Sequence, residues 1–112
     1  MSKHMQLTVT VRAYYQSSLE RTYGKLSRHL KYLEPNLVKE NPSLYELVGQ
    51  LDHLLLRFEG TPLREVLLRR RDRLLQIHKS VQEGMANWNL AQVDRLLYEI
   101  EDLFDEIESE LD

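Results

Sequence analysis

The side chains that could carry chemistry in this chain are its histidines and arginines, because the sequence has no cysteine. The lack of thiols excludes disulfide scaffolds, cysteine-ligated metal centres and thiol catalysis. His29, His53 and His78 each lack a carboxylate or another histidine three or four residues away, the spacing that helical metal sites need. The four glycines stand apart and form no phosphate-binding loop. The sequence therefore predicts no metal site and no cofactor.

One arginine and one histidine nevertheless lie close together in the sequence, and such a pair can do acid–base chemistry. Arg71 is followed by Asp72, and six residues separate Arg71 from His78. This segment resembles the Arg-x(4–6)-His motif of HEPN domains, which are all-helical modules of similar size. The resemblance implies metal-independent RNA cleavage, usually across a dimer interface. It makes His78 the proton-transfer group and Arg71 the stabiliser of phosphate charge.

A neighbouring arginine interrupts the apolar pattern of the same segment. Apolar residues recur there at spacings of three and four, and Arg70 occupies a position where another is expected. An arginine in such a place extends its stem along apolar surface, pairs with a facing carboxylate, or binds the anion of a ligand or partner. The carboxylates considered for that pairing are Asp52, Glu99 and Asp102.

Acidic residues gather near the C-terminal end of the sequence. Residues 92–112 hold nine acidic side chains and one basic, whereas residues 62–81 hold six basic and two acidic. Either the two helices meet along charged rims, or the acids form a surface for a basic partner protein. The last four acids crowd a helix end where the macrodipole disfavours negative charge, which solubility or a basic partner would explain. The candidate partner-binding residues are Glu99, Asp102, Asp105, Glu106, Glu108 and Glu110.

Four segments with helical periodicity position these residues. They are expected over residues 10–33, 43–59, 62–83 and 89–111. Ser43 and Glu46 form a capping box at the start of the second segment, and Gly60 is suited to end it. Thr61 and Pro62 then fit the N-cap and first position of the third segment. Because short connections favour antiparallel neighbours, the sequence predicts an all-α, four-helix up-and-down antiparallel bundle.

Length and composition place this bundle in one small domain. The 112 residues are 42% hydrophobic and 29% charged, which is ordinary for a globular chain. We expect a single domain over residues 1–112, with residues 1–9 as an extended or frayed lead-in. No apolar run is long enough to span a membrane, and residues 1–6 do not resemble a signal peptide. The expected location is cytoplasmic.

The functional hypothesis that follows is a non-enzymatic helical protein–protein interaction module, such as a regulator, an adaptor or a small chaperone. Its partner is expected to be another protein with basic residues at the rim of the interface, or a second copy of the chain in a homodimer. The alternative is an RNA-directed domain of the HEPN type. Basic and tyrosine residues interleave over residues 10–33 in a pattern that suits nucleic acid, although the sequence pI near 5.8 does not.

Overall fold

The computed structural model describes residues 18–112, so the expected lead-in over 1–9 and residues 10–17 of the first expected helix lie outside the described part. Within residues 18–112 the fold contains helices and no strands, which confirms the all-α class. The helices are α1 (Leu19–Thr22), α2 (Gly24–Lys31), α3 (Pro35–Lys39), α4 (Leu44–Gly49), α5 (Leu51–Arg57), α6 (Pro62–Ala86) and α7 (Leu90–Glu110).

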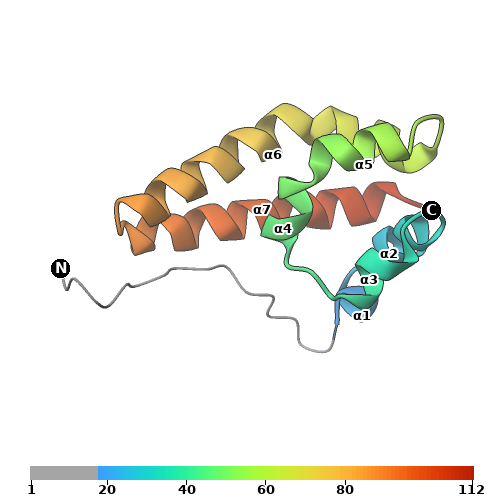
Figure 1. Cartoon of the computed structure of the whole chain (residues 1–112), viewed down its shortest axis with the longest axis horizontal. Helices are drawn as coiled ribbons and strands as arrows, with labels where there is room; N and C mark the ends of the chain where they lie inside the picture. The colour runs from blue at the N-terminus through green and yellow to red at the C-terminus, as the bar shows by residue number, and fades with distance from the viewer. Residues whose placement is uncertain (1–17) are drawn as a thin grey trace.

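Helices α6 and α7 form a long hairpin against which α2, α4 and α5 pack, and α1 and α3 contact α2 (Figure 1). The 25 residues of α6 span about 37 Å, and α7 returns antiparallel beside it. Their facing stripes are almost fully buried, and this burial is the main apolar stabilisation of the hairpin. Buried members of these stripes include Leu74, Ile77, Val81, Ile100, Phe104 and Ile107.

The local signals for helix starts and stops are present as the sequence predicts. The Ser43 hydroxyl accepts from the backbone N–H of Glu46, while the Glu46 carboxylate accepts from that of Ser43. The Thr61 side chain accepts from the Arg64 backbone N–H at the start of α6, and Gly60 before it has a φ of +82°. These contacts satisfy backbone groups that helix ends leave without intrahelical partners.

Two of the expected long helices are each divided, and one connection is itself helical. The described part of the first segment is split at Tyr23, whose φ and ψ are −126° and 69°. The second segment is split at Gln50. Helix α3 begins at Pro35 and lies in the connection expected between the first and second segments. The four-helix up-and-down arrangement is therefore not confirmed, because five of the seven helices in residues 18–112 have eight residues or fewer.

Both divisions coincide with contacts to distant parts of the chain. At the start of α2, the backbone N–H groups of Lys25 and Leu26 donate to Glu108 at 2.7 and 2.9 Å. A continuous helix would instead use those donors internally. At the end of α4, a Cβ on Gly49 would lie 3.3 Å from Nε2 of His78, so α4 approaches α6 closely before α5 begins.

The turn end of the hairpin depends on another close approach. The third helix, expected over residues 62–83, is longer in the structure, because α6 continues through Gly84 to Ala86. Gly84 is buried against α7, and a Cβ built on it would lie only 2.8 Å from Cγ2 of Val93. Because Val has a stiff, branched side chain, that contact is not relieved by a simple rotation. Glycine at position 84 therefore sets how closely α6 and α7 approach each other.

We expect Gly84→Ala to lower the free energy of unfolding by about 1 kcal/mol. Overpacking costs about 1–3 kcal/mol, and the better helix propensity of alanine offsets about 1 kcal/mol of it. Gly24→Ala is the matched control, because a Cβ there meets nothing within 4 Å. Urea unfolding of both variants measures the difference. An unchanged or raised stability for Gly84→Ala would contradict the proposed close approach.

Candidate functional site

The charged contacts between α6 and α7 centre on Arg70. Its side chain is only 15% exposed, and its guanidinium donates to Glu110 at 2.5 and 3.0 Å and to Glu106 at 3.1 Å. The hydrogen bonds from Arg70 lower the pKa of Glu110 and raise the pKa of Arg70. Arg70 is thus a largely buried ion-paired residue that links the two long helices.

The neighbouring arginines take the other carboxylates that the sequence offers. Arg73 pairs with Glu99 at 2.9 Å, and Arg71 pairs with Asp52 at 2.8 Å. None of the three carboxylates considered for Arg70 therefore binds it. Among the candidate partner-binding residues, Glu99, Glu106 and Glu110 face the arginines of α6, so this side of α7 is neutralised within the chain.

We expect Arg70→Ala to lower the free energy of unfolding by about 1–2 kcal/mol, because it removes charge-assisted hydrogen bonds and buried aliphatic stem. Arg69→Ala is the control: Arg69 is 63% exposed and lies 3.8 Å from Glu110, so its loss should change stability by less than about 0.5 kcal/mol.

The pH dependence of the same contact has a defined sign. Because the pKa of Glu110 is lowered in the fold, the contact stabilises the protein above the ordinary value of 4.5 and is lost as pH falls through the folded value. The difference between wild type and Arg70→Ala should accordingly shrink during acid titration. An equal difference at pH 7 and pH 3 would contradict this assignment.

Two further candidate acids connect α7 to the start of the described chain. The Tyr23 hydroxyl donates to Asp105 at 3.0 Å, and both carboxylate oxygens of Glu108 accept from the backbone at the start of α2. A helix N-terminus carries partial positive charge, so it compensates for Glu108 at the unfavourable end of α7. His29 contacts the backbone oxygen of Asp112 at 3.1 Å, which adds to this junction.

The remaining carboxylates of α7 take part in none of these contacts. Asp94, Glu101 and Asp102 are exposed and have no ion pair within residues 18–112. Partial burial raises the pKa of Glu101, and the charges of Asp105, Asp102 and Asp94 raise it further. These acids recur at helical spacing along one side with Leu90 and Tyr98. We call the side formed by Leu90, Asp94, Tyr98, Glu101 and Asp102 the α7 outer face.

Large apolar side chains are exposed where this face meets the hairpin turn. Trp88, Leu90 and Tyr98 are 54%, 49% and 60% exposed. The backbone of Trp88 has a φ of +57°. Its N–H donates to the carbonyl of Met85, and the N–H of Asn89 donates to that of Gly84, which together form a Schellman motif. Glycine usually occupies the position of Trp88, because other residues are strained at positive φ.

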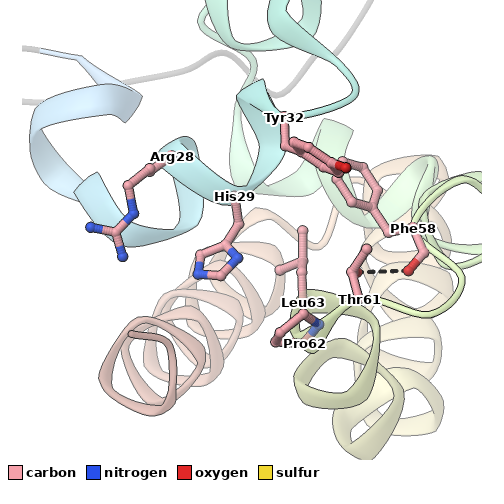
Figure 2. Close-up of a pocket in the computed structure, with 7 residues that line it drawn as sticks. All are labelled: Arg28, His29, Tyr32, Phe58, Thr61, Pro62 and Leu63. Atoms are coloured by element: carbon pink, nitrogen blue, oxygen red, sulfur yellow. Dashed lines mark hydrogen bonds between the residues drawn. The ribbon is translucent and has the colours of Figure 1, made fainter.

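A small pocket lies between the end of α2 and the turn from α5 to α6 (Figure 2). Its volume is about 270 Å³, and its walls are mainly apolar. The Thr61 hydroxyl already donates to the Phe58 carbonyl at 2.7 Å, and the figure shows the guanidinium of Arg28 directed away from both residues. The pocket thus has room for one small apolar group. Its lining residues are Arg28, His29, Tyr32, Phe58, Thr61, Pro62 and Leu63.

The two residues of the HEPN-like motif lie on the side of α6 that faces α4 and α5. The Arg71 guanidinium contacts Asp52 and also Asp72, at 3.0 Å, so carboxylates surround its charge. The His78 ring stacks on Tyr45 with centroids 4.3 Å apart and planes 10° apart. Burial lowers the pKa of His78 and thereby favours its neutral form. Both side chains already make contacts between helices.

His78 should make the stability depend on pH. Its pKa is lower in the fold than the ordinary value of 6.5, so the unfolded chain binds the proton more readily. The contribution of neutral His78 is complete above pH 6.5 and is lost as pH falls through the folded value. In urea unfolding between pH 7 and pH 5.5, His78→Gln should lose less stability than wild type. A parallel decline of the two proteins would contradict this expectation.

Comparisons of the chain with protein-family models, curated proteins and solved structures find no match. Within residues 18–112 no group of three or more histidine or carboxylate side chains is placed to hold a metal ion. No helix in the same range is long and apolar enough to cross a membrane.

Sequence reasoning missed the surface at the hairpin turn. It placed the acids on the correct helix but did not separate those that face α6 from those on the α7 outer face. It also gave no role to Trp88, although this is the single tryptophan of the chain and lies between two expected helices. A lone tryptophan in a predicted connection was the available signal.

Proposed function

We propose that the chain is a non-enzymatic helical protein–protein interaction module, and that its contact surface is Trp88 together with the α7 outer face. The observation that carries the proposal is the conformation of Trp88. A half-exposed tryptophan at a glycine-favouring φ contributes little to the core and strains the backbone. Aromatic residues in such exposed positions are frequent anchors of protein interfaces. The function proposed for Trp88 is therefore contact with a partner.

The scaffold proposed for this function is a bundle of helical layers over one domain. The α6–α7 hairpin supplies two antiparallel layers, and α4 with α5 packs beside them (Figure 1). Helices α1 and α2 are joined to the C-terminal half of α7 by the contacts of Asp105 and Glu108. This arrangement supports a rigid platform with a projecting turn, which suits an adaptor or a regulator.

The test of this proposal is Trp88→Gly, which should affect stability and binding in opposite directions. Glycine relieves the positive φ, so the free energy of unfolding should rise by about 1 kcal/mol. Capture of partner protein by the immobilised full chain from a nuclease-treated lysate should fall about fivefold or more. Because the variant is expected to be more stable, a loss of capture is not attributable to unfolding.

The matched control is Leu56→Ala, which removes an exposed apolar side chain from α5. Leu56 is 74% exposed and lies outside the proposed surface, so capture should stay at the wild-type level. Retention of the same proteins by Trp88→Gly as by wild type would contradict the proposed contact surface. Equal losses in both variants would indicate nonspecific apolar adsorption and would also contradict it.

RNA binding is a second candidate function, and the surface of α1 and α2 favours it. Arg21, Lys25, Arg28 and Tyr32 are exposed at successive spacings of four, three and four residues. These exposed side chains offer cations for phosphates and a ring for base stacking. Proteins or RNA captured only without nuclease treatment would favour this function. Its HEPN form predicts RNA cleavage in EDTA that His78→Ala abolishes.

A further inference from the structure

We propose that the partner of the α7 outer face carries a basic amphipathic helix, which lies along α7 with its apolar side against Trp88, Leu90 and Tyr98. This inference rests on the proposed function, since it names the class of partner for the same surface. It follows from the different surroundings of the carboxylates on the two sides of one helix.

On the side that faces α6, the carboxylates already have cations. Glu99 pairs with Arg73, while Glu106 and Glu110 share Arg70. On the α7 outer face, Asp94, Glu101 and Asp102 have no ion pair among the described residues. Within residues 18–112, the carboxylates of α7 without an intramolecular cation thus gather on the outer face, where a cationic partner gains most from binding.

The electrostatics of Glu101 agree with that distribution. Its pKa is raised by partial burial and by the negative charges of Asp105, Asp102 and Asp94. A carboxylate whose pKa is raised by like charges is one that a nearby cation would stabilise. Helix α7 contains one basic residue, Arg95, which follows Asp94 of the outer face. Arg95 has no ion pair within residues 18–112. One arginine leaves the three acids with a net negative charge.

The exposed apolar residues of the α7 outer face favour a helical partner over a flexible basic segment. Leu90, Asp94 and Tyr98 follow one another at spacings of four residues, and Asp102 continues the row. From Leu90 to Asp102 the row is about 18 Å long, which matches a partner helix of about three turns. Tyr98 lies between two carboxylates one turn away on either side, so an arginine or lysine there contacts the ring and a carboxylate together. Apolar residues of the partner helix would cover Leu90 and Trp88.

The probe for this proposal is a synthetic helical peptide of about 14 residues, with leucines at spacings of three and four and with lysine and arginine on both flanks. Its binding to the full chain is followed by the fluorescence of Trp88, which is the single tryptophan. We expect a saturable change in emission that weakens as ionic strength rises. A scrambled peptide of the same composition should bind at least about tenfold more weakly.

The decisive comparison uses carboxylates from the two sides of α7. Asp94→Asn with Glu101→Gln and Asp102→Asn should lower the affinity for the peptide about tenfold or more. Glu99→Gln with Glu106→Gln removes paired carboxylates from the same helix and should leave the affinity within about twofold of wild type. Circular dichroism of both variants checks that helicity is retained.

Each other outcome overturns the proposal in a recognisable way. Equal affinities for the outer-face variant and wild type, or equal losses in both variants, would show that the outer carboxylates do not select the partner. A wild-type protein that does not bind the peptide would reject a basic helix as partner. If Trp88→Gly still lost capture in that case, the proposed function would stand without this partner class.

A second copy of the chain is the other occupant that the test must detect. Arg21, Lys25 and Arg28 of one copy could meet the α7 outer face of another, since all three are exposed. Sedimentation of the wild type at increasing concentration measures this association. Self-association that is lost both in the outer-face variant and in an Arg21→Gln, Lys25→Gln, Arg28→Gln variant would identify a second copy as the partner and overturn the proposal.

Discussion

The placement of α7 depends on one guanidinium held in an apolar seam. Arg70 is 85% removed from solvent relative to a free side chain, so leaving it without carboxylates would be costly. Glu106 and Glu110 are one turn apart, and both reach Arg70 only in one alignment of the two helices. Burial of apolar stripes is non-directional, so it specifies the alignment of the two helices less sharply than directed hydrogen bonds do. The ion pairs therefore define the register of the hairpin.

Other parts of the fold follow from that register. Glu108 lies two residues from both Glu106 and Glu110, so it projects from a different side of α7 and reaches the start of α2. The same rotation leaves Asp94, Glu101 and Asp102 on a side that the described helices do not neutralise. A single helix thus joins two elements of the fold and retains a charged surface. This division of roles among nine acids is the basis of the proposed recognition.

Features set by local chemistry could be predicted from the sequence, and features set by distant contacts could not. Ser43 with Glu46, and Thr61 with Pro62, begin helices where their side chains satisfy nearby backbone groups. The division at Tyr23 needs Glu108, which is 83 residues from Lys25 along the chain. For the site, the sequence identifies acids on one helix but not the side that faces α6. The positive φ of Trp88 could not be predicted either. It depends on the position at which α6 ends, and α6 continues beyond Gly84 to Ala86.

The contact between Glu108 and the start of α2 also bears on the order of events during synthesis. Lys25 and Leu26 are added to the growing chain about 4–17 s before Glu108 at ordinary elongation rates. During that interval Leu26 and Leu30, which are buried in the finished fold, lack the end of α7 to pack beside. The nascent chain must therefore keep an early apolar segment from aggregating until a late segment arrives. The N-terminal helices of this protein can therefore reach their final packing only after the end of α7 has been synthesised.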